Sequence, residues 1–87
     1  MLFMVIETFR HGPGAVRERF FAEGRLMPEG LRYVASWIEN GGGRCFQIIE
    51  ADDPARIPEW TSRWADLIDF EIVPVLTSAA YWAAFTG

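Results

Sequence analysis

The 87-residue sequence predicts an α+β fold with four strands and two helices in the order β-α-β-β-α-β. A glycine-rich turn at residues 40–43 joins two apolar runs into a hairpin. One amphipathic helical pattern precedes this hairpin and another follows it, and two further apolar runs, at residues 2–6 and 70–76, flank the whole arrangement. With 51% hydrophobic and 15% aromatic residues, a chain of this length is expected to form one globular domain with no room for a second core.

The first elements are a buried strand and an amphipathic helix. Residues 2–6 form a continuous apolar run that ends in Glu7, and its length favours a strand over a helix. The sequence His-Gly-Pro-Gly at residues 11–14 predicts a loop. From Ala15 the pattern becomes helical, with apolar residues on one side. Pro28 is expected to end this helix, because the residue before a proline resists the α region.

The hairpin at residues 30–50 is the centre of the predicted sheet. Its glycines allow the positive φ angles of a tight turn, and a turn centred on Gly41 and Gly42 sets the register. Opposed residues of an antiparallel pair share a face, so both faces are largely apolar and we expect both to be covered. The register places Trp37 opposite Phe46, Ala35 opposite Ile48 and Tyr33 opposite Glu50 on one face, with Ser36 opposite Gln47, Ile38 opposite Cys45 and Val34 opposite Ile49 on the other.

A second helix is expected after the hairpin. Asp53 is a good helix cap, and Pro54 suits the first helical position. Pro58 is awkward in the next turn, so the helix is expected to start late or to begin with a distorted turn. Four apolar residues at spacings of 3, 4 and 3 form the face that packs on the sheet: Ile57, Trp60, Trp64 and Leu67.

The last strand and the tail complete the chain. Residues 70–76 predict a strand, and Pro74 places it at a sheet edge because proline cannot donate to a ladder. The predicted domain spans residues 1–78. Residues 79–87 form an apolar tail, short and poorly capped, which is expected to dock on another surface. Its large aromatic residues are Tyr81, Trp82 and Phe85.

This order of elements is that of ferredoxin-like folds, in which the strands lie in the order 4-1-3-2 and both helices cover one face. The other face is open in a single chain, although the strands are apolar there as well. Two such sheets packed face to face would bury it and enclose a cavity. We therefore expect a homodimer with the architecture of a dimeric α/β barrel.

Composition argues against several classes of function. The formal net charge of −4 comes without a basic stripe, so nucleic-acid binding is not expected. No apolar run reaches the roughly 20 residues of a membrane span, and the first residues lack the basic region of a signal peptide. The lone Cys45 cannot form an intramolecular disulfide and suits a reducing compartment. We expect a soluble, cytoplasmic protein.

Four blocks of sequence resemble the DUF3303 family: LFMVIE, MPEGLRYVASW, RCFQ and WADLIDFEIVPVLTS. The resemblance covers residues 2–78. It implies a bacterial protein with the dimeric α/β-barrel fold. The family name denotes unknown function, so the resemblance supplies no catalytic residues. The wider group of dimeric barrels includes small monooxygenases, polyketide cyclases, decarboxylases and haem-handling proteins, but that likeness is one of fold.

Candidate catalytic residues follow from the strand order. In a 4-1-3-2 sheet the end of the first strand lies beside the starts of the third and fourth, which brings Glu7, Arg44 and Glu71 to one end. Two carboxyl groups on neighbouring strands could have separated pKa values and act as acid and base. Alternatively, both are solvated rim residues or are paired with Arg44. His11 can fold over the same end, either as a general base or as an ordinary exposed loop residue.

Candidate ligand-binding residues lie on the hairpin. Trp37, Phe46 and Tyr33 share a predicted face, where they either line an aromatic ligand cavity or form the layer under the helices. Gln47 and Ser36 form a polar pair on the opposite face. No second histidine or cysteine stands at ligand spacing and no phosphate-binding loop follows a strand, so neither a metal nor a cofactor is expected. Cys45 is expected to be a buried, inert thiol.

These observations predict a homodimer that binds a small, largely apolar or aromatic molecule. Cofactor-free chemistry of a cyclase, isomerase or monooxygenase type is one possibility, with Glu7 or Glu71 as the base, and Trp37 and Gln47 positioning the ligand. The sequence leaves open whether the protein is an enzyme. The alternative is a non-catalytic interaction or oligomerisation module that docks through its aromatic tail.

Overall fold

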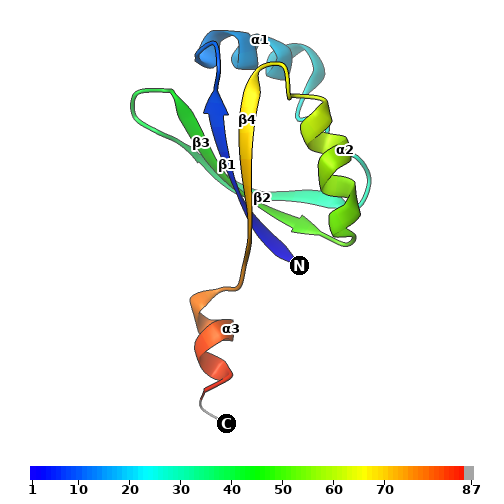
Figure 1. Ribbon diagram of the computed structural model, residues 1–87, viewed down its shortest axis with the longest axis vertical. Coiled ribbons are helices and arrows are strands. Elements are labelled where there is room, and N and C mark those ends of the chain that lie inside the picture. The colour runs from blue at the N-terminus through cyan, green and yellow to red at the C-terminus, as the bar shows by residue number, and fades with distance from the viewer. Residues whose placement is uncertain (86–87) are drawn as a thin grey trace.

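The hairpin organises an open, four-stranded antiparallel sheet. In the computed structural model, which describes residues 1–85, β3 pairs with β2 on one side and with β1 on the other, and β4 pairs with the remaining edge of β1. The strand order β2-β3-β1-β4 confirms the predicted ferredoxin-like α+β fold (Figure 1). The elements are β1 (Leu2–Phe9), α1 (Pro13–Glu23), β2 (Leu31–Ile38), β3 (Arg44–Ala51), a 3₁₀ turn η1 (Pro54–Arg56), α2 (Ile57–Ser62), β4 (Ile68–Val75) and α3 (Ser78–Ala83).

One face of the sheet forms the core with α2. Alternation along β1 sends Phe3 and Val5 to this face, and both are buried. The stripe predicted for the second helix packs there as expected, with Ile57, Trp60 and Trp64 buried and Leu67 partly buried. Val16 of α1 packs against the same cluster, so both helices cover one face.

The hairpin register is as predicted near the turn and changes further along. Trp37 pairs with Phe46 and Ala35 with Ile48, but Tyr33 pairs with Ile49 and not with Glu50. An irregularity between Tyr33 and Ala35 absorbs one residue, as a β-bulge does. The predicted pairs of Tyr33 with Glu50 and of Val34 with Ile49 are therefore wrong. The bulge also moves Tyr33 off the face of Trp37 and onto the helix-covered face.

The end of α1 differs from expectation, whereas the start of α2 agrees with it. α1 ends at Glu23 because Gly24 adopts φ 73° and donates its N–H to the Phe20 carbonyl, so the chain leaves the helix before Pro28. α2 begins after a 3₁₀ turn capped by Asp53, which accepts from the Ala55 N–H at 3.0 Å. This is the distorted start that Pro58 predicted.

The last third of the chain contains two further differences. β4 begins at Ile68, earlier than predicted, and Pro74 lies on this edge strand as expected. The tail was predicted to be poorly capped, but Thr77 caps α3 by accepting from the Ala80 N–H at 3.1 Å. α3 lies beyond the end of the sheet (Figure 1). Residues 86–87 of the predicted tail lie outside the described residues.

The second face of the sheet is apolar, as predicted. Opposed pairs on it include Ile6 with Phe46 and Met4 with Val73, all half-buried. Trp37 on the same face is 60% exposed. We refer to this surface, made by the residues of the four strands that point away from α1 and α2, as the open face. Among residues 1–85, no helix is long and apolar enough to cross a membrane.

Candidate functional site

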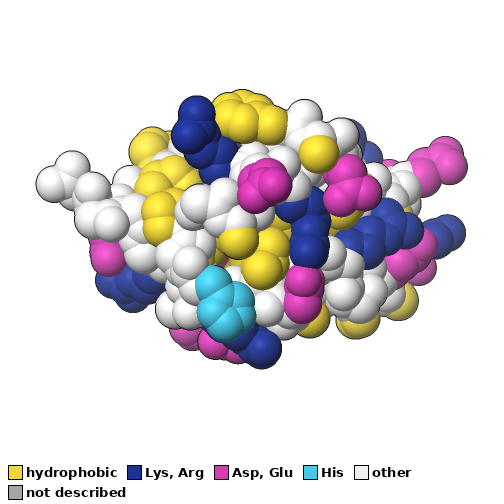
Figure 2. Space-filling model, turned by 90° about the horizontal axis from the view of Figure 1, so that it is seen from above, with side chains coloured by type: hydrophobic (Ala, Val, Ile, Leu, Met, Phe, Trp, Pro, Cys, Tyr) yellow, Lys and Arg dark blue, Asp and Glu magenta, His cyan; other side chains and the backbone are white. Residues whose placement is uncertain are grey.

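A cavity of about 410 Å³ lies between the sheet and the two helices that cover it. This volume falls within the range of small-molecule sites. Figure 2, which looks onto the α1 end of the molecule, shows apolar side chains at the surface between arginine and acidic side chains. Aromatic and aliphatic side chains make most of the cavity wall, among them Phe9, Val16, Phe20, Trp60, Trp64 and Phe70, and the polar lining residues are Glu7, Arg17, Arg25, Ser36 and Gln47.

Glu7 provides a carboxyl group within this apolar wall. It follows Phe3 and Val5 at alternating positions of β1, so its side chain lies on the helix-covered face, where it is only 5% exposed. Its Oε2 accepts a hydrogen bond of 2.7 Å from Nε2 of Gln47 on β3. The Gln47 carbonyl oxygen in turn accepts from Nη1 of Arg25 at 3.2 Å. A polar chain therefore runs from guanidinium through amide to carboxyl.

This chain determines where a proton on Glu7 would sit. The Gln47 amide is oriented because its oxygen is used by Arg25, and its NH₂ group therefore faces Glu7 Oε2. No other side chain among residues 1–85 donates to the carboxyl. Within this range Oε1 has no hydrogen-bond partner, whereas every buried polar side-chain atom has one. Oε1 is therefore not fully buried, and it is reachable from the cavity that Glu7 lines. A neutral Glu7 would consequently carry its proton on Oε1 and present it to a ligand.

Burial raises the pKa of Glu7 from 4.5 to about 7. The hydrogen bond from Gln47 and the positive charge of Arg25 both lower this pKa, but they do not offset the loss of water around the carboxylate. Both protonation states are therefore accessible near neutral pH, which is the condition for a general acid or base.

α2 and the turn that follows it hold the backbone of Arg25 in place. The Arg25 carbonyl accepts from the indole nitrogens of Trp60 at 3.0 Å and Trp64 at 2.9 Å. Its guanidinium lies 3.6 Å from the centre of the Tyr33 ring and 5.2 Å from that of Phe20, within cation–π range. The two tryptophans thus serve both as core and as an anchor for the loop.

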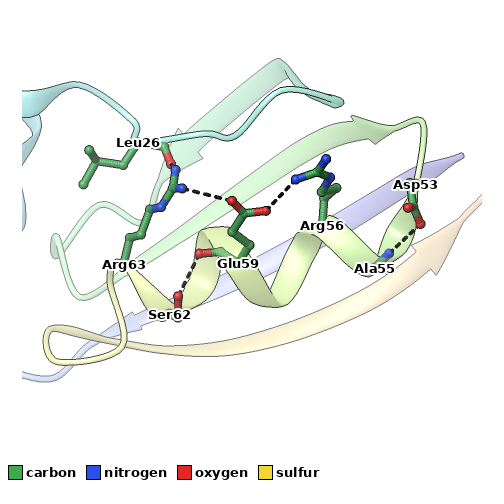
Figure 3. Close-up of polar contacts among 7 residues, drawn as sticks. All are labelled: Leu26, Asp53, Ala55, Arg56, Glu59, Ser62 and Arg63. Carbon is green, nitrogen blue, oxygen red and sulfur yellow. Dashed lines mark hydrogen bonds and ion pairs between the residues drawn. The ribbon is translucent and has the colours of Figure 1, made fainter.

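The next residue of that loop is held from the same helix. The Leu26 carbonyl accepts from Arg63 at 2.7 Å (Figure 3). Leu26 itself adopts a positive φ angle of 58°. Glu59 bridges Arg63 and Arg56 at 3.2 and 3.0 Å along the exposed side of α2. The loop that carries Arg25 is therefore tied to α2 and the turn after it at two consecutive carbonyl groups.

Cys45 lies opposite Glu7 in the β1–β3 ladder and is buried. Burial, reinforced by the negative charge of Glu7, raises the pKa of its thiol to about 12. The group is therefore a neutral thiol near pH 7, and a nucleophilic thiolate is disfavoured.

Comparison with known proteins identifies the family. The family model described as "Domain of unknown function (DUF3303)" matches residues 1–87. The chain belongs to this family. No curated protein and no solved structure matches it.

The structure brings together only part of the residue set proposed from the sequence. Glu7 and Gln47 are in contact across β1 and β3. Glu71 lies at a similar level of the sheet but pairs with Ile6, so it projects from the open face and is exposed. Consecutive residues of a strand point to opposite faces, which separates the two carboxyl groups that were considered as an acid–base pair.

The other candidate residues lie outside the cavity wall. Trp37 and Arg44 are on the open face, where Arg44 bonds to Glu39 at 2.8 Å and not to either candidate carboxyl group. His11 is exposed in the turn after β1. Tyr33 contributes indirectly, through its ring contact with Arg25. Within residues 1–85, no group of histidine, cysteine, aspartate and glutamate side chains could hold a metal ion.

Arg25 is the functional residue that sequence reasoning missed. It stands in the irregular segment between α1 and β2, where no periodicity indicates the direction of a side chain. Trp60 and Trp64 were recognised as core residues, but their indole N–H groups needed an acceptor once buried. That requirement was the one available signal that a backbone carbonyl from a loop would lie against α2.

Proposed function

We propose that this DUF3303 protein binds a small, largely apolar or aromatic molecule in the cavity between sheet and helices, and that Glu7 exchanges a proton with it. The observation that carries the proposal is a nearly buried carboxyl group in an apolar cavity wall, with one oxygen held by Gln47 and the other facing the cavity. Glu71 has no part in this proposal because it projects from the other face.

The chemistry that suits this arrangement is proton transfer at the carbon next to a carbonyl group. The Glu7 carboxylate would take a proton from carbon, and the electron pair of that C–H bond would move onto the ligand oxygen. Arg25 has guanidinium N–H groups beyond the one used by Gln47, and these would stabilise the resulting enolate. Return of the proton to a different carbon completes an isomerisation. In a ligand with a second carbonyl group, attack of the enolate carbon on that carbonyl carbon breaks its C=O π bond, and the resulting alkoxide takes the proton back from Glu7, which completes a cyclisation. Neither step needs a cofactor.

The test uses a panel of alkyl aryl ketones, which carry C–H protons next to the carbonyl group, and substituted phenols, which serve as ligands in the binding measurement only. Binding is measured by calorimetric titration, and proton transfer by NMR, as exchange of ligand C–H protons for deuterium in D₂O. We expect Glu7→Gln to bind ligands with similar affinity but to lose at least 100-fold of the exchange rate, the usual contribution of a general base. Glu71→Gln, which changes an exposed carboxylate on the open face, is the matched control and should keep both. An exchange rate equal in wild type and Glu7→Gln would exclude the catalytic part, and absence of binding across the panel would exclude this ligand class.

The open face favours a second role, which we propose is self-association. Its half-buried aliphatic and aromatic residues and the exposed Trp37 are apolar surface that a second copy would remove from water. Light scattering on a sizing column should give twice the chain mass of 9.9 kDa, and Trp37→Ser should shift the protein toward monomer. A mass of one chain at all concentrations would exclude this role without affecting the cavity.

A further inference from the structure

The C-terminal helix carries the most exposed aromatic cluster of the described chain. α3 continues from β4 past the end of the sheet (Figure 1). The rings of Tyr81 and Trp82 on α3 and of Phe85 just after it contact one another, with centroids 5.2 to 5.9 Å apart. These three rings are called the aromatic cluster of α3. Their exposed fractions are nevertheless 48%, 63% and 68%. The rings thus form a preassembled apolar cluster that the rest of the chain does not bury.

Such a segment is expected to dock rather than stand alone in water. A helix of six residues is far below the length at which isolated helices are stable. Residues 77–85 contain no charged side chain, so a charged partner surface would find nothing to pair with. The complementary surface must be apolar.

The same chain provides an apolar groove beside α3. A hollow of about 760 Å³ lies between α3 and the sheet end. Its wall is largely apolar, with Leu2, Pro74, Val75 and Leu76 from the sheet end and Tyr81 and Trp82 from α3 itself, and Glu50 is its charged lining residue. Leu2 and Val75 are opposed in the β1–β4 ladder, and on the open face they are the next pair after Met4 and Val73. The groove is therefore continuous with the surface that we propose for self-association.

We propose that the aromatic cluster of α3 inserts into this groove on a second copy of the chain, and that the second copy does the same in return. The proposal rests on the self-association proposed above. A two-fold axis makes the exchange reciprocal, so the rings of each copy pack into the groove of the other, where they also meet the Tyr81 and Trp82 rings of that copy. At about 150–250 Å² per aromatic side chain, the exposed parts of the three rings amount to roughly 350 Å². A stable interface needs about 800 Å² per partner, and the adjoining open face supplies apolar surface for the remainder.

The first test is sedimentation equilibrium of the full chain. The double variant Trp82→Ser with Phe85→Ser should raise the dimer dissociation constant at least tenfold, because it removes two rings from the interface. Phe21→Ser is the matched control, since Phe21 on α1 is 71% exposed but lies on the helix-covered side. It should leave the constant unchanged. A dimer weakened by Trp37→Ser but not by the double variant would overturn the arm exchange and leave the open-face pairing intact.

The second test places the arm. A benzophenone amino acid in place of Trp82 is photolysed in a mixture of ¹⁴N- and ¹⁵N-labelled chains, and cross-linked peptides are identified by mass. We expect mixed-isotope products joining α3 to the β1 and β4 ends near Leu2 and Val75. Cross-links within one chain only, or to α1 and α2 of another chain, would overturn the proposal. So would a wild-type protein that remains monomeric, which would remove the self-association as well.

Discussion

The two faces of the sheet are alike in composition, since both are largely apolar, but the helices bury only one of them. The helix-covered face buries Val5 and Ile49 completely and holds Glu7, whose environment moves its pKa to about 7. The open face presents Phe46, half-buried, and Trp37, largely exposed, and its carboxylate Glu71 stays at the surface. Apolar strand residues alone therefore mark neither a core nor a site. The decisive feature is a second layer, which removes water from whatever polar group lies beneath it.

The largest contrast between the faces should appear in stability. Trp60→Ala should lower the free energy of unfolding by about 3–5 kcal/mol, because it empties a buried ring site and leaves the Arg25 carbonyl with one donor fewer. Trp37→Ala should cost about 1 kcal/mol or less within a single chain, since its ring is mostly exposed. Urea denaturation measures both, at protein concentrations low enough that self-association does not contribute.

Trp60→Phe separates packing from anchoring. It keeps most of the ring volume but removes the indole N–H, so the cost should fall to about 1–2 kcal/mol. Equal losses for Trp60→Ala and Trp37→Ala would contradict the assignment of the helix-covered face as the core.

The second largest effect is a pH dependence that only one face should show. The pKa of Glu7 rises on folding from 4.5 to about 7, so the folded state holds the proton more tightly. The stabilisation is complete below pH 4.5 and is lost as the pH rises to about 7, in total about 3 kcal/mol. Between pH 4.5 and about 7, the wild type should therefore lose unfolding free energy relative to Glu7→Gln as the pH rises.

Glu71→Gln is the control for that pH series. It removes an exposed carboxylate from the open face, and it is therefore the reference for the loss of one surface charge. Comparing variants at each pH also cancels the contribution of other groups, such as Asp66, whose pKa is lowered to about 2 by Arg19. If the difference in unfolding free energy between wild type and Glu7→Gln did not change with pH, the Glu7 carboxyl group would be hydrated in solution.

A smaller effect concerns the polar chain. Gln47→Leu removes the hydrogen bond that lowers the pKa of Glu7, so the titration midpoint of Glu7 followed by carbon-detected NMR should move above 7. Ser36→Ala, which alters a neighbouring polar residue of the cavity without a bond to Glu7, should leave the midpoint in place. A downward shift in Gln47→Leu would show that water replaces the amide.

The smallest effect is expected at the rim of the open face. Arg44→Gln breaks an ion pair with Glu39 in which both side chains are largely solvated, so the unfolding free energy should change by about 0.5 kcal/mol or less. Thermal denaturation in low and high salt measures this change. A loss above 2 kcal/mol would mean that the open face is less solvated than its exposure suggests.

The order of elements and the topology of the sheet could be predicted from the sequence because their signals are local. The glycines at residues 41–43 indicate a tight turn, Asp53 followed by Pro54 marks a helix start, and Pro74 excludes a central strand. Each signal depends on the backbone chemistry of a few neighbouring residues. Contact of Glu7 with Gln47 could not be read in this way, since the pattern showed two apolar faces and could not say which one the helices would cover.

The sequence by itself determined that this chain is a four-stranded, two-layered α+β domain with apolar surface on both sides of its sheet. Only the tertiary structure decided which face the helices shield from water. That choice raises the pKa of Glu7 to about 7 and leaves Glu71 at the surface. The tertiary structure also decided the bulge that turns Tyr33 toward Arg25, and the position of Arg25 itself. The physical reason is that desolvation and side-chain contacts across a layer depend on segments far apart in the chain, whereas turns, caps and alternation depend on neighbours.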